Sequence, residues 1–304
     1  LRYRLAQAGG SFGEEADTGI AASGGAGVPM DYDGDGLADV LTVSAAGRWL
    51  VVRGAAGGLG AAIDTGIAAR PIDYRGADLN GDGLGDLVYS ESIGTSGNGL
   101  VVRVRYNTRG AGFSATPVTL YEQGYHTGYE VAEGGNFLGR PGQRIDLDGD
   151  GREDLMMNEE YSIARISADS RMSEAFDSSF SGGAPADVNG DGCTDFVYPH
   201  YLGRWRVRFS PCLVEGPTGV EITGPTYAPG IREPLAFDWN GDGKDDLLYR
   251  DGSTNWKVVQ SAGDSLLPTI DPAIAHGPPT GVAVADLDGD GLPDLAARSR
   301  GALA

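Results

Sequence analysis

The chain has 304 residues, of which 43 are Asp or Glu and only 23 are Lys or Arg, so its formal net charge is −20. A surplus of negative charge argues against nucleic acids and anionic lipid surfaces as partners, because both carry phosphate charge of the same sign. No run of 18 apolar residues occurs, so no transmembrane helix is predicted and we expect no membrane insertion.

One nine-residue phrase, Asp-x-Asp/Asn-Gly-Asp-Gly-x-x-Asp, recurs six times along the chain. Its copies start 41 to 68 residues apart, a period typical of repeat architectures. They cover 31–39, 78–86, 146–154, 187–195, 238–246 and 286–294. Oxygen ligands at positions 1, 3 and 5 converge only if the backbone curls tightly, and the two glycines of each copy permit that curl. Ca²⁺ accepts such flexible oxygen geometry better than Mg²⁺.

The sequence therefore predicts about six structural Ca²⁺ ions, one in each copy. Positions 1, 3, 5 and 9 offer side-chain oxygens. Position 7 is expected to offer its main-chain carbonyl, because its side chains share no chemistry. The predicted ligands are Asp31, Asp33, Asp35, Leu37, Asp39, Asp78, Asn80, Asp82, Leu84, Asp86, Asp146, Asp148, Asp150, Arg152, Asp154, Asp187, Asn189, Asp191, Cys193, Asp195, Asp238, Asn240, Asp242, Lys244, Asp246, Asp286, Asp288, Asp290, Leu292 and Asp294.

The residues after each phrase exclude the EF-hand, which requires Glu at position 12 and a helix behind the loop. Position 12 holds no Glu in any copy, and most of the following segments are short runs of aliphatic, β-branched and aromatic residues. Such runs predict strands buried on both faces. Apolar residues then alternate with Arg or Lys, as in 47–53 and 203–209, which predicts a half-exposed strand.

A short segment of small residues, such as 26–30 or 183–186, precedes each phrase and predicts a strand crowded around a central axis. Each unit thus reads as an inner strand, a calcium loop, a buried strand, an alternating strand and a looser outer strand. Four strands recurring about every 50 residues predict a β-propeller. Recurring Trp and Tyr residues are interpreted as core packing.

The phrase and the strand behind it resemble the FG-GAP/VCBS repeat, the calcium-binding blade of integrin α-like propellers and of many secreted bacterial proteins. The segment 238–252, followed by Trp256-Lys-Val258, is most similar to the bacterial versions, including those in RHS-type and insecticidal-toxin-complex B components. The resemblance covers essentially the whole chain. It implies an all-β, calcium-binding propeller that acts as a binding module.

We expect six four-stranded antiparallel blades in one domain, 1–304, with seven blades as the alternative. The opening 1–20 resembles the back half of a blade and is expected to complete the blade begun at 282–299. This pairing of the N- and C-terminal strands would remove exposed sheet edges. The second blade is the longest and carries an insertion at about 90–140.

The two cysteines, Cys193 and Cys212, flank the predicted hairpin 195–210 and are expected to form a disulfide across its two strands. The alternative is a pair of reduced, half-buried thiols. A disulfide and calcium loops both suit an extracellular, secreted or cell-surface protein.

The insertion in the second blade is the candidate contact surface for a protein or glycan partner, because insertions in one repeat often lie on the binding face. Its candidate residues are Tyr121, Tyr125, His126, Tyr129, Glu130 and Arg140. A decorative loop is the alternative for this segment. A larger chain or assembly is expected around the domain.

No catalytic motif is apparent, since the three histidines, at 126, 200 and 276, show no metal-ligand spacing. We therefore expect a non-catalytic, calcium-stabilised binding or assembly module. A polysaccharide-lyase-like enzyme or a lectin on the same scaffold is the alternative, because the fold alone does not determine function.

Overall fold

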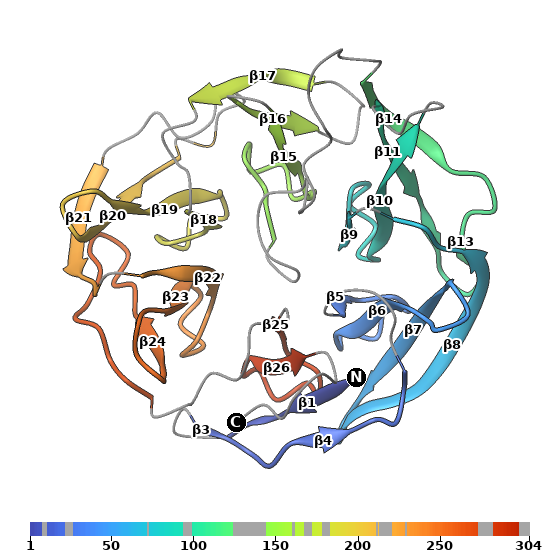
Figure 1. Cartoon of the computed structure of the whole chain (residues 1–304), viewed down its shortest axis with the longest axis horizontal. Coiled ribbons are helices and arrows are strands. Elements are labelled where there is room, and N and C mark those ends of the chain that lie inside the picture. Colours follow the sequence, from blue (N-terminus) through green and yellow to red (C-terminus); the bar gives the residue numbers. More distant parts are fainter. Residues whose placement is uncertain are drawn as a thin grey trace.

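The computed structural model describes residues 1–7, 11–21, 27–71, 73–93, 99–123, 144–159, 162–166, 172–177, 183–210, 212, 221–228, 230–272 and 282–297. Within these residues every regular element is a β-strand. The strands form antiparallel sheets arranged radially around a central axis (Figure 1). The β-propeller predicted from the sequence is confirmed. No helix able to cross a membrane occurs in the described part of the chain.

Each copy of the phrase forms a loop that belongs to one sheet, and we number each sheet and each loop by its copy. The first sheet contains β5 (Val28–Met30), β6 (Asp39–Val43), β7 (Arg48–Ala55) and β8 (Gly58–Ala68) in that order. The second contains β9 (Asp73–Ala77), β10 (Asp86–Ile93), β11 (Gly99–Arg105) and β14 (Val118–Gln123). The third contains β15 (Leu155–Glu159), β16 (Ser162–Ile166) and β17 (Met172–Asp177).

The remaining sheets repeat the same order. The fourth contains β18 (Ala184–Ala186), β19 (Asp195–His200), β20 (Arg204–Arg208) and β21 (Glu221–Thr226). The fifth contains β22 (Arg232–Phe237), β23 (Asp246–Arg250) and β24 (Trp256–Val259). The sixth is ordered β25 (Val282–Ala285), β26 (Asp294–Ala297), β1 (Arg2–Arg4) and β4 (Ala16–Asp17). A small two-stranded sheet pairs β2 (Ala6–Gln7) with β3 (Ser11–Phe12).

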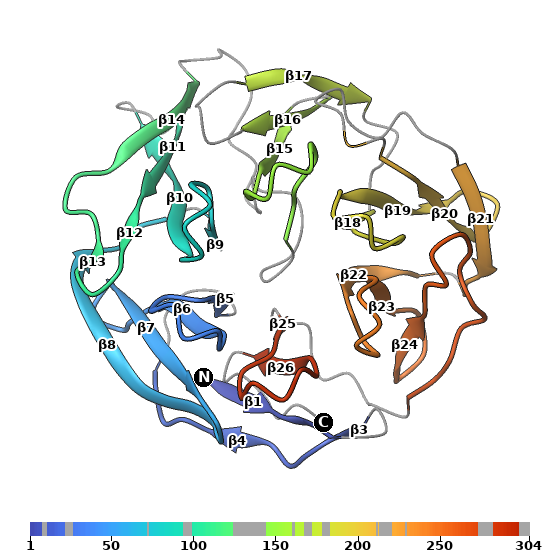
Figure 2. The same cartoon turned by 180° about the vertical axis from the view of Figure 1, so that it is seen from behind.

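The sixth sheet combines strands from both ends of the chain. Strand β1 pairs with β26 from Arg2↔Ala297 to Arg4↔Leu295, and β4 pairs with β1 on the other side. Both views of the ring show β1 beside β26 (Figures 1 and 2). Strands β1 and β4 therefore occupy in the sixth sheet the positions that β7 and β8 occupy in the first sheet.

The outermost strand segments of the first and sixth sheets have the same local structure, which supports this equivalence. Both contain the sequence Asp-Thr-Gly-Ile. The Gly19 amide donates to Oδ1 of Asp17 at 2.9 Å, and the Gly66 amide donates to Oδ1 of Asp64 at the same distance. Thr18 donates its hydroxyl hydrogen to the main chain of the third strand, as its counterpart in the first sheet does.

The hydrophobic core is divided among the junctions between neighbouring sheets. One cluster of buried residues lies at each junction, for example the set at Leu1, Val40, Val52 and Leu287 between the sixth and first sheets. The predicted aromatic packing is confirmed. Trp49 packs on Tyr89 of the second sheet with ring centroids 6.0 Å apart. Trp205 packs on Tyr249 of the fifth sheet at 5.0 Å.

The second repeat contains a short hairpin, equivalent to β2–β3 of the sixth sheet, that was not predicted from the sequence. Strands β12 (Asn107–Thr108) and β13 (Gly112–Phe113) form this hairpin between β11 and β14. It packs against the first loop, where the Phe113 ring lies 5.2 Å from that of Tyr32 and the Asn107 side-chain amide donates to the Tyr32 carbonyl. The hairpin therefore has a structural role.

Truncation of Leu1 tests the packing of the N-terminal strand. Leu1 is 1% exposed, so Leu1→Ala should lower the free energy of unfolding in urea by about 2–4 kcal/mol through lost burial and the resulting cavity. Leu202, which is 64% exposed, provides the matched control, and Leu202→Ala should cost less than about 0.5 kcal/mol. Equal costs for the two variants would contradict the packing of the N-terminal strand.

Candidate metal centres

The first aspartate of each loop organises its own backbone. In the first loop the amides of Gly34 and Gly36 donate to the two carboxylate oxygens of Asp31, at 2.7 and 3.0 Å. The same pair of hydrogen bonds, from positions 4 and 6 to position 1, occurs in the other five loops. The glycines donating these bonds have φ between +71° and +88°, a region that favours glycine.

The ninth aspartate joins the loop to the sheet behind it. Oδ2 of Asp39 accepts from the Tyr32 amide at position 2, and Oδ1 accepts from the Gly54 amide at the end of the third strand, at 2.8 and 2.7 Å. Asp195 is held in the same way by Val188 and Ser210. The ninth position therefore fixes the loop, the second strand and the third strand relative to one another.

The sixth loop uses the N-terminal segment in this role. Oδ1 of Asp294 accepts from the Ala6 amide at 2.6 Å, and Oδ2 accepts from the Leu287 amide at 2.8 Å. Ala6 follows β1 as Gly54 follows the main part of the third strand in the first sheet. The hydrogen bond thus gives a second, independent indication that residues 1–7 complete the sixth sheet.

Burial makes the ninth carboxylates unusually weak acids. It raises the pKa of Asp86 to about 7, although the amide donors of Asn107 and Leu79 act in the opposite direction. Burial has the same leading effect at four other ninth positions, with pKa values of about 6 or 7 at Asp39, Asp195, Asp246 and Asp294. A cation beside these groups would favour their charged form.

The side chains at position 3, and in the sixth loop at position 5, add to the donor set. In the first, third and sixth loops, carboxylate oxygens of three aspartates lie within 4.8 Å of one another. These groups are Asp31, Asp33 and Asp39; Asp146, Asp148 and Asp154; and Asp286, Asp288 and Asp290. In the other loops position 3 is Asn, whose side-chain nitrogen donates to the aspartate at position 5. The donors are hard oxygens, which suits Ca²⁺.

Cationic side chains already neighbour several of these carboxylates. The Arg53 guanidinium forms an ion pair with Asp33 and lies 4.0 Å from Oδ2 of Asp35. Nζ of Lys244 lies 3.4 Å from Oδ2 of Asp242 in the fifth loop. These contacts show that the loop carboxylates face positions where positive charge is favourable. The donor set and its electrostatics therefore fit a bound divalent cation.

Neighbouring loops are joined by main-chain hydrogen bonds. The amide at position 8 of one loop donates to the carbonyl of position 1 in the preceding loop, with N–O distances of 2.7–3.0 Å. The donor and acceptor pairs are Ala38 to Asp286, Gly85 to Asp31, Glu153 to Asp78, Thr194 to Asp146 and Asp245 to Asp187. At the fourth and fifth loops the side chain at position 8 also accepts from the position 1 amide of the preceding loop, at 2.8 and 2.9 Å.

The position 7 side chain contacts the preceding loop, a role that its varied chemistry concealed. A Cβ added at Gly81 would lie 3.2 Å from Cγ of Arg152, and one at Gly190 would lie 3.3 Å from Cγ of Lys244. The glycine at position 4 is thus required by packing as well as by φ. The expected main-chain carbonyl ligand at position 7 stays a prediction.

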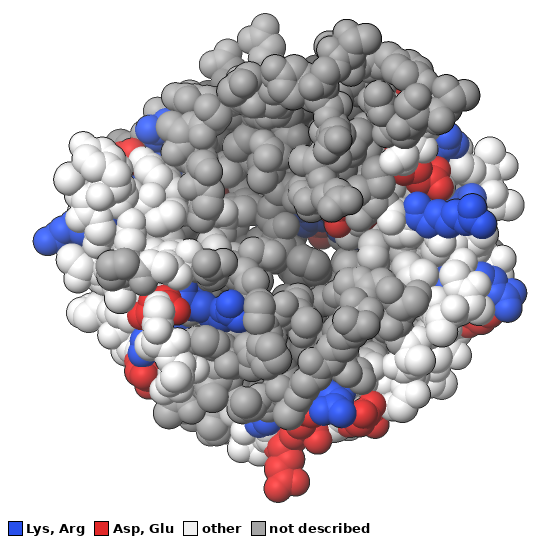
Figure 3. Space-filling model, in the orientation of Figure 1, with Lys and Arg blue, Asp and Glu red and all other residues white. Residues whose placement is uncertain are grey.

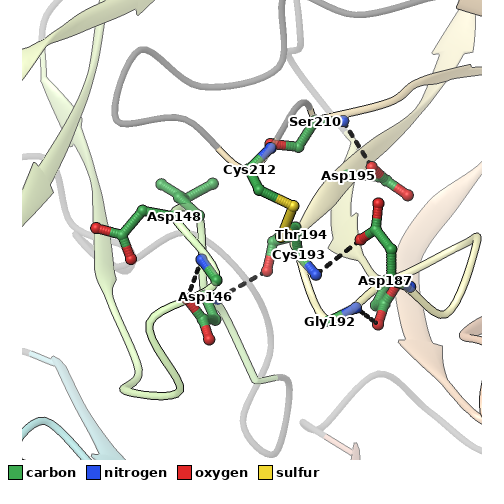
Figure 4. The surroundings of a disulfide bond; sticks show 12 residues. Asp146, Asp148, Asp187, Gly192, Cys193, Thr194, Asp195, Ser210 and Cys212 are labelled. Atoms are coloured by element: carbon green, nitrogen blue, oxygen red, sulfur yellow. Dashed lines mark hydrogen bonds between the residues drawn. A yellow bond between two sulfur atoms is a disulfide. The ribbon is translucent and has the colours of Figure 1, made fainter.

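Cys193 and Cys212 form a disulfide with Cα atoms 5.5 Å apart. Cys193 lies in the fourth loop and Cys212 follows β20, so the disulfide flanks the hairpin of β19 and β20 as predicted, just beyond its paired residues (Figure 4). A Cβ added at Gly149 of the third loop would lie 2.9 Å from Sγ of Cys193. The disulfide therefore packs against a neighbouring loop.

The first aspartates of all six loops line two cavities near the axis. The larger, about 520 Å³, is bordered by Asp31, Asp78, Asp286 and Glu153. The smaller, about 230 Å³, is bordered by Asp146, Asp187, Asp238 and Asp245. Arg144 borders both cavities, and burial raises the pKa of Glu153 to about 7. The loops thus surround the centre of the ring with carboxylates.

The candidate partner residues are only partly described. Tyr121 belongs to β14 and packs against the cluster between the second and third sheets. Tyr125, His126, Tyr129, Glu130 and Arg140 lie outside the described residues, as does His276. Nδ1 of His200 accepts from the Leu202 amide at 3.3 Å, which is a structural role in a turn. On the face in Figure 3, the visible charged side chains of both signs are interspersed around the rim.

Parts of the chain are similar to known proteins. Residues 238–297 match the FG-GAP-like repeat family. Cartilage acidic protein 1 of Mus musculus is 31% identical over 127 residues, which are 38% of this chain and 20% of that protein. The Homo sapiens protein of the same name is 30% identical over 127 residues, covering 38% and 19%. The chain thus spans about a fifth of the length of these relatives.

A solved structure of TcdB2-TccC3 without its hypervariable C-terminal region resembles the fold, with a TM-score of 0.46 and 15% sequence identity. The match covers 91% of this chain and 13% of that one. The class defined by fold and site is a β-propeller whose loops carry aspartate-rich phrases. Residues 238–297 match the FG-GAP-like repeat, and the same loop geometry recurs in the other five copies of the phrase.

Two glycines of the third loop separate packing from backbone strain. Both Gly149 and Gly151 have positive φ, but only a Cβ at Gly149 would meet the disulfide, since one at Gly151 has no neighbour within 4 Å. Gly151→Ala should cost about 1–2 kcal/mol of unfolding free energy. Gly149→Ala should cost about 1 kcal/mol more, because the sulfur must move. Urea unfolding in EDTA measures both, and equal costs would contradict the contact.

Proposed function

We propose that this chain is a six-bladed propeller rigidified by calcium, and that it acts as a non-catalytic binding or assembly module of an extracellular, secreted or cell-surface protein. Each three- or four-stranded sheet described above would be one blade. The observation that carries the proposal is the common hydrogen-bond pattern of the loops, which holds positions 1 and 9, together with the grouping of three aspartate carboxylates in the first, third and sixth loops.

Calcium would be held by the carboxylates at positions 1, 5 and 9, the Asp or Asn oxygen at position 3 and the carbonyl at position 7. Its chemical contribution is positive charge, which offsets the repulsion among several carboxylates and favours the ionised form of the buried ninth aspartate. The loop residues themselves connect the inner and second strands of each sheet. Binding would therefore stabilise the folded ring without performing chemistry.

The proposed compartment follows from the same sites. Calcium loops of this kind suit surroundings where calcium is abundant, and the Cys193–Cys212 disulfide suits an oxidising one. No cluster of catalytic side chains is apparent among the residues that the structure describes. Binding of a protein or glycan is consequently the function that the site supports best.

Removal of calcium tests the proposal directly. Because Ca²⁺ would bind the folded state and not the unfolded one, millimolar calcium should raise the melting temperature, and excess EDTA should lower it by several degrees. Differential scanning calorimetry measures the shift, with Mg²⁺ at the same concentration as the control. A melting temperature indifferent to calcium and EDTA would refute calcium stabilisation.

The insertion in the second repeat is the proposed contact surface for a protein partner. Replacing 122–138 by a short Gly-containing turn should leave the ring folded, because it removes only the last two paired residues of β14, Glu122 and Gln123. We expect partner binding, measured by biolayer interferometry with the other segments of the parent protein as immobilised ligands, to weaken by at least about tenfold. The control is a deletion of residues 56–57, which form the turn between β7 and β8 and lie outside the proposed contact surface. A folded variant that binds unchanged would contradict this surface.

A further inference from the structure

The junction between the fifth and sixth sheets differs from the others in its backbone connections. Position 8 of the sixth loop is Pro293, and proline has no amide hydrogen. The hydrogen bond that joins the other loops to their predecessors therefore cannot form from Pro293 to the carbonyl of Asp238. Five junctions carry this bond at 2.7–3.0 Å. The junction between the fifth and sixth sheets cannot form this bond, because Pro293 has no amide hydrogen.

The side-chain contact between these two loops is missing as well. At four other junctions the position 7 side chain packs on the position 4 glycine of the preceding loop, as Leu37 does on Gly289, where an added Cβ would lie 2.5 Å from Cδ2. A Cβ added at Gly241 of the fifth loop would meet no described atom within 4 Å. Leu292 thus leaves Gly241 uncovered.

Two further connections found at other junctions have no counterpart here. Ser261 donates its hydroxyl hydrogen to the carbonyl of Val188 across the fourth–fifth junction, and Asn107 makes the equivalent bond across the first–second junction. The residue in this place in the sixth sheet is Ala6, which has no side-chain donor. Position 12, the Tyr that packs on Trp205 at the fourth–fifth junction, is Ala297.

Apolar packing holds this junction instead. Leu235, Trp256 and Val284 belong to its cluster, and the Phe12 ring lies 6.0 Å from that of Trp239. Apolar contacts are not directional, so they resist separation but do not fix the two loops at one register. Local opening of a protein follows its least connected boundaries.

We propose that the ring has a built-in seam between its fifth and sixth sheets, at which it opens locally while the other junctions stay closed. Pro293 is the residue that removes the connecting hydrogen bond. The loops are thus connected as a chain that runs from the fifth loop back through the fourth, third, second and first to the sixth. This property does not depend on whether calcium is bound.

Thiol accessibility tests the seam at two equivalent positions. Val284 and Ala236 each lie two residues before a loop and are buried, Val284 at the fifth–sixth junction and Ala236 at the fourth–fifth junction. Val284→Cys and Ala236→Cys each introduce one free thiol, since Cys193 and Cys212 are joined. Alkylation by iodoacetamide under native conditions then reports opening at each junction.

We expect Val284→Cys to react at least about fivefold faster than Ala236→Cys, with a weak dependence on urea that marks local opening. Pro293→Thr should slow the Val284→Cys reaction, because Thr194 shows that threonine at position 8 makes both inter-loop bonds. Equal rates at the two positions, or a rate at Val284→Cys that Pro293→Thr leaves unchanged, would overturn the seam.

The reverse substitution provides the matched control. Thr194→Pro removes the connecting bond at the third–fourth junction, where Met156 is fully buried. Met156→Cys should therefore react faster in the Thr194→Pro background than alone. If the double variant does not fold, the comparison of Val284→Cys with Ala236→Cys still decides the proposal. An unchanged rate in a folded double variant would overturn the role assigned to the position 8 bond.

Discussion

The rest of the structure depends on the carboxylate at the ninth position of each loop. It is buried, and at Asp39, Asp195 and Asp294 it accepts one hydrogen bond from its own loop and one from the end of the third strand. Loop conformation, strand register and sheet assembly are therefore set by one side chain. At Asp294 the strand-end donor is Ala6, so the same interaction joins the two ends of the chain.

Such a carboxylate is costly to bury, and its raised pKa expresses that cost. Two amide donors reduce the cost without removing it, because hydrogen bonding competes here with desolvation. A divalent cation at positions 1, 3 and 5 would supply the remaining compensation. This is why the calcium proposal rests on the donor geometry and its electrostatics together, and why the high negative charge of the chain is concentrated where the loops lie.

The sequence predicted the elements that are determined by local residue patterns. The apolar run after each phrase became the buried second strand, as at Asp39–Val43 and Asp246–Arg250. The Asp-Thr-Gly-Ile sequence shared by 17–20 and 64–67 correctly indicated that 16–20 resembles the outer part of a blade. Positions 1, 3, 5, 7 and 9 were predicted as ligands of a cation, and the structure shows that the aspartate at position 1 holds the backbone of its own loop by hydrogen bonds.

What the sequence did not reveal depends on contacts between repeats. The hairpin β12–β13 has only two residues in each strand, too few for a periodic pattern, and it is held by contacts with Tyr32 in another repeat. Position 7 was interpreted through its backbone because Arg152, Cys193 and Lys244 look unrelated. Their common feature is the glycine they cover, and that glycine had already been explained by its φ. Because its φ already accounted for the glycine, its second role in packing was not apparent from the sequence.

The inter-loop contacts also explain how the ring tolerates proline at one position. Strand pairing between β1 and β26 completes the sixth sheet internally, whereas the loop bonds connect one sheet to the next. Strand pairing and loop bonding are separate, and Pro293 removes only the hydrogen bond between loops. Since each net hydrogen bond contributes about 1 kcal/mol, a junction can lose its loop bond and still be held by an apolar cluster such as that around Trp256. A closed ring with several redundant junctions can therefore keep one weaker boundary without losing its fold.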